Sequence, residues 1–430
     1  MSDTARLPVG TLPLGTGAGG LVLAGPHEHV LFSGSTGSGK TSRGIAPALL
    51  RSTDSHAVVL SSKTDTINAT YRARSMHGTV YVLDPRNATG GRVSSTTLDV
   101  CAWGAASYDA AREAVAVFKN SAPSDGLHDS AFWLRLGAKR ITPYWWVAAV
   151  SGYSLRRVHE WLTDESTDWE FQLALEAART RFPADGAAAE ADYRRCVEAE
   201  HRTKSSIELT SDVILDMLGS PAVLGSLSEP GFTVEEFAAG PGANTLYLSL
   251  PDAHRDGLGA AFTTLLMRVV HHWQNLEAAG TPASRPLLLV IDEAARSLLV
   301  QDLPDLLSRV RSAGVRIVSA WQDLAQAEAA YGTHSLYSLL TNTAWVLQFG
   351  GARDPVTVDR LEFRLAGREV PGLDAPVGQR LRQLPAGKAL VVGHTHAELV
   401  SAPGYWQDPS LRSLPTLWLP LPAYLADTGP

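Results

Sequence analysis

The sequence predicts an α/β fold in which a mostly parallel sheet is flanked by helices and an all-helical domain is inserted into the chain. Two observations predict the sheet. Short apolar runs alternate with helical stretches in both halves of the chain, and a glycine-rich loop follows one of the first of these runs. A third observation predicts the insertion, because helical periodicity replaces the strand pattern over residues 125–231.

The composition is that of an ordinary globular protein and excludes several other classes. The chain has 430 residues, of which 45% are hydrophobic and 19% charged, enough for two or three domains. A formal net charge of −7 provides no overall basic field, so contact with DNA must come from local clusters or from assembly into a ring. Two cysteines exclude a disulfide framework. No apolar run reaches the about 18 residues that span a membrane, and no signal pattern opens the chain, which predicts a cytosolic protein.

The first part of the chain supplies the first strands of the sheet. We expect a hairpin or strand within residues 1–28 and strands over residues 29–32, 57–60 and 79–83. In parallel sheets, ligands bind beyond the carboxyl ends of the strands. Three segments are therefore expected at that edge, namely residues 34–41, residues 61–65 and Asp84.

The loop that follows residues 29–32 fits the phosphate-binding pattern G-x-x-x-x-G-K-[ST] at every fixed position. It predicts nucleotide contacts by Gly34, Ser35, Thr36, Gly37, Ser38, Gly39, Lys40, Thr41 and Ser42. Glycines let backbone N–H groups curl around phosphate oxygens at the positive end of the next helix. Lys40 would pair with the β- and γ-phosphates and the Thr41 hydroxyl would bind Mg²⁺, so the predicted cofactors are ATP and Mg²⁺.

The insertion is predicted to consist of helices joined by short connections. Helical periodicity covers residues 131–139, 154–162, 169–181 and 193–218. Residues 182–192 contain Pro183 and Gly186, and we expect them to connect two helices.

The aromatic and basic residues of the insertion permit two interpretations. Its tryptophans form either a core or a base-stacking surface, and burial of large aromatics favours the core: Trp133, Trp145, Trp146, Trp161 and Trp169. Its basic residues line either solvated helix faces or a nucleic-acid surface: Arg135, Lys139, Arg140, Arg194, Arg195, Arg202 and Lys204. Interleaved acids such as Glu198 and Glu200 favour solvated faces.

The α/β pattern resumes near residue 232. A capping box at residues 233–236 opens a short helix. Strands are expected over residues 245–250, 287–291, 315–321 and 345–349, helices over 258–276 and 303–312 and after Asp354, and a hairpin within 389–401. His394, His396 and Glu398 would share one face of that hairpin, which suits either a metal or an ordinary polar surface.

The second chemical element is the pair of acids Asp292 and Glu293 at the end of a buried strand. Asp292 would hold the Mg²⁺ shell and Glu293 would polarise the attacking water. Gln322 ends the next strand, where it would either sense the γ-phosphate or cap a turn. Arg309 and Arg311 lie near the end of the helix expected over residues 303–312. Either they reach the nucleotide of a neighbouring subunit, or they are surface residues near the negative end of the helix dipole.

Together these residues resemble the TraG/TraD-type coupling proteins of type IV secretion and conjugation, a family of hexameric RecA-like P-loop ATPases related to the FtsK and HerA DNA motors. The resemblance covers residues 30–409. Besides the two nucleotide motifs, it rests on residues 45–50, 58–65, 80–85, 303–306, 319–326 and 380–387. The stretch Trp321-Gln322-x-Leu324-Ala325-Gln326 is much more specific than the nucleotide motifs, which many ATPases share.

The resemblance assigns a role to each of the site residues. It implies Glu293, Lys40, Gln322 and Arg311 as catalytic residues, Arg311 by its spacing as a trans-acting arginine, and Thr41 and Asp292 as Mg²⁺ ligands. The domains expected are residues 1–124 and 232–409 as two parts of a RecA-like domain, 125–231 as an all-helical domain facing cargo, and 410–430 as a proline-rich extended tail.

The resemblance implies an ATP-driven coupling or DNA-translocation motor of conjugation, working as a hexameric ring with DNA or relaxase-type protein cargo. Two alternatives stay open: an ATP-gated adaptor for protein cargo, and a DNA-processing motor outside transfer.

Two departures from the family pattern matter. Residues 61–65 read Ser-Ser-Lys-Thr-Asp where many members have Asp-Pro-Lys-Gly-Glu, so that loop receives no role. Transmembrane helices that open anchored members are not found here, so the expected protein is cytoplasmic, with recruitment to the inner face of the membrane by a secretion-channel subunit as the open variant.

Overall fold

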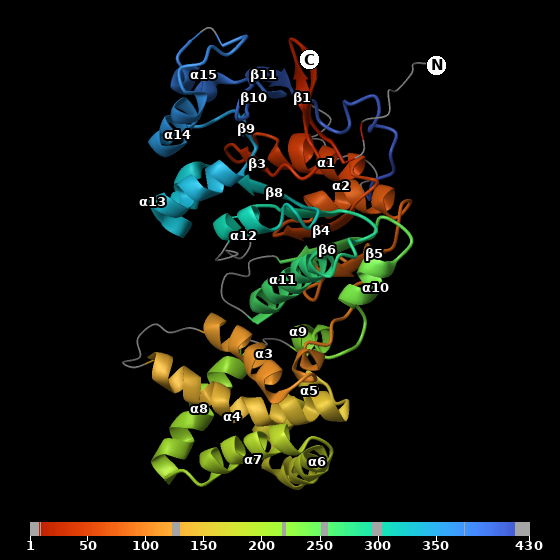
Figure 1. Ribbon diagram of the computed structural model, residues 1–430, viewed down its shortest axis with the longest axis vertical. Helices are drawn as coiled ribbons and strands as arrows, with labels where there is room; N and C mark the ends of the chain where they lie inside the picture. Colours follow the sequence, from red (N-terminus) through yellow and green to blue (C-terminus); the bar gives the residue numbers. More distant parts are fainter. Residues whose placement is uncertain are drawn as a thin grey trace.

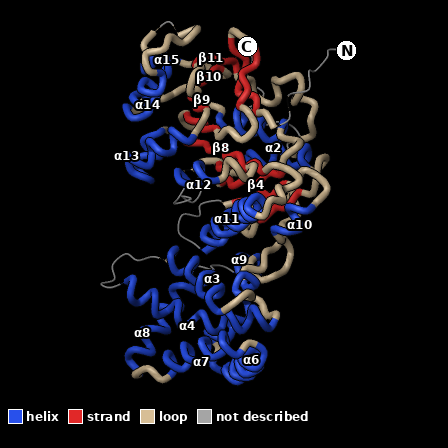
Figure 2. Tube along the Cα trace, in the orientation of Figure 1, coloured by secondary structure: helices blue, strands red, loops and turns tan. Residues whose placement is uncertain are grey.

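The computed structural model describes residues 8, 10–122, 130–216, 221–250, 257–294, 303–373 and 375–417. They form two lobes, one built on a large sheet and one built only of helices (Figures 1 and 2). The fold class predicted from the sequence, mixed α/β with a mostly parallel sheet and an all-helical part, is confirmed.

The sheet joins eleven described strands in the order β2-β1-β11-β10-β9-β3-β8-β7-β4-β6-β5. Their bounds are β1 Leu12–Gly17, β2 Gly20–Ala24, β3 Val30–Ser33, β4 His56–Ser61, β5 Val80–Leu83, β6 Thr245–Ser249, β7 Leu287–Ile291, β8 Val315–Trp321, β9 Trp345–Phe349, β10 Lys388–Val392 and β11 Ala397–Ser401. From β9 to β5 all neighbours run parallel, and the two expected hairpins extend the other edge in antiparallel pairing. Parallel strands need helical crossovers, which explains the alternation in the sequence.

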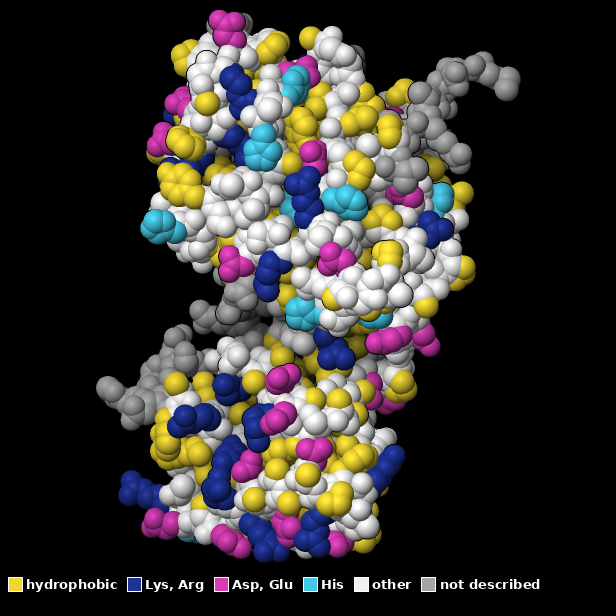
Figure 3. Space-filling model, in the orientation of Figure 1, with side chains coloured by type: hydrophobic (Ala, Val, Ile, Leu, Met, Phe, Trp, Pro, Cys, Tyr) yellow, Lys and Arg dark blue, Asp and Glu magenta, His cyan; other side chains and the backbone are white. Residues whose placement is uncertain are grey.

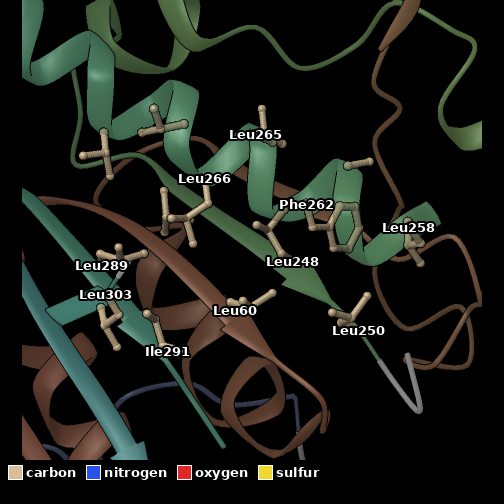
Figure 4. Packing of buried hydrophobic residues seen from close by; sticks show 14 of the residues in the cluster. Leu60, Leu248, Leu250, Leu258, Phe262, Leu265, Leu266, Leu289, Ile291 and Leu303 are labelled. Atoms are coloured by element: carbon tan, nitrogen blue, oxygen red, sulfur yellow. The ribbon is translucent and has the colours of Figure 1, made fainter. Parts of the chain in front are cut away.

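Helices cover both faces of this sheet. They are η1 Lys40–Ile45 (a π-helix), α1 Ala46–Arg51, α2 Asp65–Arg74, α10 Val234–Ala239, α11 Gly257–Ala278, α12 Leu303–Arg309, α13 Leu324–Asn342, α14 Pro355–Leu365 and α15 Val377–Gln383. Residues on one face of the strands, such as Phe32 and Val59, share a core with Ile45 and Leu49. The alternate residues pack on the other side, where Leu60, Leu248 and Leu289 meet Phe262 and Leu266 of α11 (Figure 4). The alternation of strand side chains thus separates two cores.

The second lobe is helical throughout its described residues. Its elements are η2 Cys101–Gly104 and η3 Glu165–Thr167 (both 3₁₀), α3 Tyr108–Ser121, α4 Ser130–Ser151, α5 Leu155–Thr163, α6 Asp168–Arg181, α7 Pro183–Val197, α8 His201–Asp216 and α9 Pro221–Ser226. α3 packs against both α4 and α11, so one apolar core runs from the sheet into the helical lobe (Figure 1).

Two sequence-based predictions for this lobe are wrong. Residues 182–192 were expected to connect helices but lie almost entirely in α7, which begins at Pro183. Proline is favoured in the first turn of a helix, and the alanines that follow outweigh Gly186. Gly186 also permits close packing, because a Cβ there would lie 2.5 Å from Arg179 Cα. Residues 193–218 were expected to form one helix, but α7 ends at Val197 and α8 begins at His201.

The expectation that the tryptophans form a core holds for three of the five. Trp145, Trp146 and Trp161 are buried, and Trp133 is half-buried. Trp169 is the exception, with 68% of its surface exposed on α6. Among the described helices, none combines the length and apolar character needed to cross a membrane.

A buried arginine fastens α2 to its surroundings. Arg74 is fully buried, and its guanidinium donates to the carbonyl oxygens of Leu49, Ser52, Ser55 and Ala243 and to the Thr245 hydroxyl. Two of these carbonyls, those of Leu49 and Ser52, lie at the end of α1, where no helical partner exists. One side chain therefore holds α1, α2 and β6 together.

Replacing Arg74 with leucine should destabilise the fold. The change leaves several buried carbonyl oxygens without a donor, so we expect the free energy of unfolding to fall by about 3 kcal/mol. Urea denaturation measures it. The control is Arg72→Leu, an exposed arginine of the same helix, for which the change should stay within about 0.5 kcal/mol. Equal loss in both variants would contradict this role for Arg74.

Candidate nucleotide-binding site

A cavity of about 450 Å³ lies beyond the carboxyl ends of β3, β4 and β7. Its wall includes the whole loop of residues 35–42, the acids Asp292 and Glu293, and Lys63 and Asp65 from the segment after β4. The two motifs that lie far apart in the sequence therefore open onto one space.

The glycine loop has the backbone geometry that its sequence predicts. Gly37 and Gly39 have φ values of +79° and +95°, in the left-handed region that favours glycine. Lys40 opens the helix that follows, and its Nζ donates to the carbonyl oxygens of Gly34 and Ser35, the latter at 3.1 Å. Burial lowers the pKa of Lys40, while Asp292 and Glu293 oppose that shift. The loop thus curls around its own lysine.

Asp292 lies at the centre of a set of hydroxyl donors. Its Oδ2 accepts from Thr41 Oγ1 at 3.4 Å, from Ser61 Oγ at 3.3 Å and from Thr66 Oγ1 at 3.2 Å. Burial and the neighbouring Glu293 raise the pKa of the Asp292 carboxyl. A hydroxyl and a carboxylate held this closely are oxygen donors of the kind that Mg²⁺ prefers beside a phosphate.

Glu293 is held in a strained turn by two residues of the β4 loop. Its φ is +52°, which is uncommon for a residue with a side chain. Ser62 Oγ donates to its Oε2 at 2.8 Å, and Lys63 forms an ion pair with its Oε1. This geometry turns the carboxylate toward the cavity, which Glu293 lines.

The parallel register explains why these groups meet. β8 lies between β3 and β7, with Val30 opposite Val318 and Leu287 opposite Val315. At the carboxyl edge, Gly34 N donates to Trp321 O at 3.2 Å and Ala294 N donates to Ala320 O at 2.8 Å. The glycine loop and the acidic turn are both fastened to the last residues of β8.

Gln322 lies at the same edge, directly after β8, but does not line the cavity. Its Oε1 accepts from Gln326 Nε2 at 3.2 Å, one turn into α13. It is adjacent to the site and holds a helix-start contact in this conformation. Both interpretations from the sequence remain compatible with that position.

Arg311 lies at the opposite edge of the sheet. The predicted helix over residues 303–312 ends at Arg309, and Arg311 is exposed in the turn before β8. Seven residues of β8 separate this turn from the cavity, roughly 20 Å of extended chain. Arg311 therefore does not reach the cavity of its own chain. Asp84 follows the carboxyl end of β5, as expected, but does not line the cavity. Its carboxylate accepts hydrogen bonds within its own loop, from Ala88 N, Thr89 N and Thr89 Oγ1.

Sequence reasoning placed residues 61–65 at this edge of the sheet but gave them no role in the site. Ser61, Ser62, Lys63 and Thr66 all contact the acidic pair. The available signal was topological, because β4 pairs with β7 in parallel and both strands must end at the same edge. The departure of residues 61–65 from the family pattern was the reason that no role was assigned to them.

Two other candidate sites receive less support from the geometry. His396 Nε2 and Glu398 Oε1 lie 2.6 Å apart, but no cluster of three or more His, Cys, Asp or Glu side chains able to hold a metal occurs in the described residues. In the helical lobe, basic side chains alternate with acids (Figure 3). Arg194 pairs with Glu190, Arg195 and Lys139 with Asp192, and Lys204 with Glu208. These pairs favour solvated helix faces.

The buried charge of Asp292 carries a stability prediction. Asp292→Asn should raise the free energy of unfolding of the nucleotide-free protein by about 0.5–2 kcal/mol at neutral pH, because the ionised carboxylate is desolvated and repelled by Glu293. The pKa of the Asp292 carboxyl is higher in the folded protein than in the unfolded chain. The difference in unfolding free energy between Asp292→Asn and the parent should therefore shrink as the pH falls from the folded-state pKa towards the unfolded-state pKa. Urea titrations at several pH values measure it.

The control for this test is Asp359→Asn, at an exposed position of α14, where the free energy of unfolding should stay within about 0.5 kcal/mol of the parent. A loss of stability in Asp292→Asn at neutral pH would contradict the assignment of a destabilising charge.

Comparison with known proteins agrees with this geometry. Residues 3–366 match the family model described as Type IV secretory system, conjugative DNA transfer. The unbound bacterial conjugative coupling protein TrwBdeltaN70 is 19% identical, with 93% of this chain and 90% of that chain covered and a TM-score of 0.61. The plasmid coupling protein TrwB in complex with ADP and Mg²⁺ is 18% identical, with 88% and 85% covered and a TM-score of 0.57.

VirB4 of Thermoanaerobacter pseudethanolicus is also similar in structure, at 13% identity, with 94% of this chain and 98% of that chain covered and a TM-score of 0.52. None of the curated protein sequences compared with this chain matches it significantly. The structural likeness shows that the fold is shared with these proteins.

Proposed function

Because this chain belongs to the type IV secretory system conjugative DNA transfer family, we propose that it hydrolyses ATP with Mg²⁺ and drives DNA transfer as a coupling or translocation motor. The observation that carries the proposal is the convergence of Lys40, Thr41, Asp292 and Glu293 on one cavity. The structurally similar TrwB binds ADP and Mg²⁺, which supports the same ligands here.

In this proposal the glycine loop binds the triphosphate and orients it. Backbone N–H groups of residues 35–42 point at the phosphates, and Lys40 moves from the carbonyls of Gly34 and Ser35 to the β- and γ-phosphate oxygens. Thr41 and Asp292 would hold Mg²⁺, which supplies neutralisation of the charge that develops on the phosphates. The hydroxyls of Ser61 and Thr66 keep the Asp292 carboxylate oriented.

Glu293 is the residue we assign to the attacking water. A general base must lie within hydrogen-bond reach of the proton it accepts, and the Glu293 carboxylate faces the cavity beside Asp292. Ser62 and Lys63 hold it in the nucleotide-free chain. Gln322, which lies at the tip of β8 and outside the cavity wall in this conformation, would orient the same water after its contact with Gln326 opens.

Arg311 completes the site only if a second copy of the chain is present. It is exposed at the sheet edge opposite its own cavity, so it can serve only a neighbour's nucleotide. A closed ring supplies one such neighbour to every site. We therefore assign a ring, of the hexameric kind, as the active form and expect isolated monomers to hydrolyse ATP slowly.

The helical lobe begins before the predicted domain boundary at residue 125, because η2 and α3 (residues 101–121) belong to it. Residues up to about 100 together with residues 232–409 would form the hydrolysing module, and the helical lobe would form the module that meets DNA or relaxase-type cargo. Of the extended tail expected over residues 410–430, residues 410–413 form turns in which Leu411 is buried, and residues 418–430 lie outside the described residues. The apolar core shared by α3, α4 and α11 gives the two modules a mechanical connection. The site of action would be the cytoplasm, at the inner face of the membrane when a secretion-channel subunit recruits the protein.

The first test removes the water-activating carboxylate. Glu293→Gln should bind ATP with near-parental affinity and lower the turnover number by about 10²- to 10⁴-fold, the usual contribution of a general base. Nucleotide affinity and phosphate release are measured on the same preparation. Turnover at the parental rate would remove Glu293 from this role.

The second test asks whether Arg311 acts between subunits. Arg311→Ala should keep its ATP affinity and lose about 10³-fold or more in turnover, as for other arginine fingers. Lys40→Ala cannot hydrolyse ATP in its own cavity but keeps Arg311, which can reach the cavity of a neighbouring subunit. Mixing the two inactive variants should therefore restore part of the turnover.

The matched control is Arg309→Ala, an exposed arginine two residues away, which should retain the parental rate. If the mixture stayed inactive although mixed rings form, the assignment of Arg311 to the neighbouring site would be wrong.

A second function is favoured by the charges of the helical lobe. The net charge of −7 and the ion pairs of Arg194, Arg195 and Lys204 suit an ATP-gated adaptor for protein cargo. A DNA-processing motor outside transfer would share the same site, but no described residue favours it.

DNA stimulation separates the motor from the adaptor. For the motor, steady-state turnover should rise when single- or double-stranded DNA is added, and the stimulation should fall steeply between low and moderate salt as counterions compete. Turnover that rises with protein concentration but ignores both DNAs at every salt concentration would favour the adaptor.

A further inference from the structure

The cavity extends past the phosphate loop into a corner that the phosphate and metal chemistry does not use. This base corner, as we name it, is walled by Arg43, Ala46, Pro385, Tyr405 and Trp406. It begins three residues after Lys40, so a group attached to a bound triphosphate would lie near it.

The aromatic wall of the base corner comes from the chain after β11 and is fastened to the helix after the glycine loop. Tyr405 N donates a hydrogen bond to Ser42 O at 3.1 Å, and Arg51 forms an ion pair with Asp408. Arg43 Nη1 donates to Ala402 O at 3.3 Å and to Gln407 Oε1 at 3.2 Å. The position of Trp406 is therefore set relative to the phosphate loop.

Three glycines make room for the side chains of the base corner. A Cβ on Gly39 would lie 2.6 Å from Arg43 Cδ, and one on Gly387 would lie 3.1 Å from Arg43 Nη1. A Cβ on Gly404 would lie 2.6 Å from the Trp406 ring. Gly39 and Gly387 also have positive φ values, so neither position accepts another residue without strain. The backbone is shaped to seat the arginine and the indole.

The chemistry of this wall suits a flat aromatic ligand. The Arg43 guanidinium carbon lies 5.7 Å from the centroid of the Trp406 ring, a cation–π pair. Indole and guanidinium planes both stack on nucleobases, and stacking is tolerant of base identity because every base has a π-face. None of the five wall residues carries a carboxylate or carboxamide that could read the edge of the base.

We propose that the base corner binds the purine base of the nucleoside triphosphate, with Trp406 as its stacking surface and Arg43 as its clamp. This rests on the proposed function, since it takes the triphosphate to lie in the glycine loop. Because contact is with the π-face, the corner accepts adenine and guanine alike. Base recognition thus depends on the segment after β11, far along the chain from the phosphate loop.

The test compares nucleotides with a ligand that has the phosphates but no base. Trp406→Ala should weaken the binding of ATP and of GTP by about 10- to 100-fold, the usual effect of losing one stacking partner, and leave the affinity for inorganic tripolyphosphate unchanged. Isothermal titration with Mg²⁺ present measures all three. Trp169→Ala, at the exposed tryptophan of α6, is the matched control and should change none of them.

A conservative variant keeps the test valid if Trp406→Ala folds poorly. Trp406→Phe retains an aromatic face and should bind ATP within a few-fold of the parent. It should also show weaker energy transfer from tryptophan to a methylanthraniloyl-labelled ATP than the parent, because Trp406 lines the cavity.

Three results would overturn the proposal. Equal losses for tripolyphosphate and ATP in Trp406→Ala would show that Trp406 only supports the phosphate loop. Unchanged ATP affinity in Trp406→Ala would show that the base corner does not bind the base, while the proposed ATPase function would still stand. If the parent bound neither ATP nor tripolyphosphate, the proposed function would fail together with the base corner.

Discussion

The site depends on one constraint, the parallel register of β3, β8 and β7. Parallel pairing places the ends of all three strands at a single edge, so the loop after β3 and the acids after β7 must meet there, although Thr41 and Asp292 are 251 positions apart in the sequence. β8 joins them directly, through its last carbonyl groups to Gly34 and Ala294. A slip of one residue in this register would turn the strand side chains to the wrong core and separate Thr41 from Asp292.

Several features at that edge lower the stability of the protein, and interactions elsewhere in the fold offset this cost. Lys40 and Asp292 are both buried charges whose pKa values shift against ionisation, and Glu293 has a left-handed backbone conformation. Such features are costly and persist where surrounding structure fixes them. Here the fixing structure is the two-sided sheet core and the hydroxyls of Ser61 and Thr66. In the proposed function, a bound Mg²⁺-triphosphate would offset these costs, because it would place opposite charge beside Lys40 and Asp292.

The sequence predicts the strands, the glycine loop and the acidic pair because each has a local signature. Apolar runs ended by polar residues mark buried strands, and the spacing of Gly34, Gly39 and Lys40 follows from phosphate geometry. What fails is decided by tertiary contacts. Residues 182–192 look like a connection, yet they form α7, in which Pro183 suits the first turn and the missing Cβ of Gly186 permits close packing on α6. Lys63, Arg43 and Trp406 have no local signature, since their roles arise only when distant segments meet.

We infer that the shared edge of β3 and β7 hydrolyses Mg²⁺-ATP. The most direct measurement is phosphate release from ATP by the parent and by Lys40→Ala over a range of protein concentrations, with and without a chelator of Mg²⁺. We expect parental turnover that requires Mg²⁺ and rises faster than linearly with concentration, and background release from Lys40→Ala throughout. A Lys40→Ala protein that released phosphate at the parental rate would contradict the account.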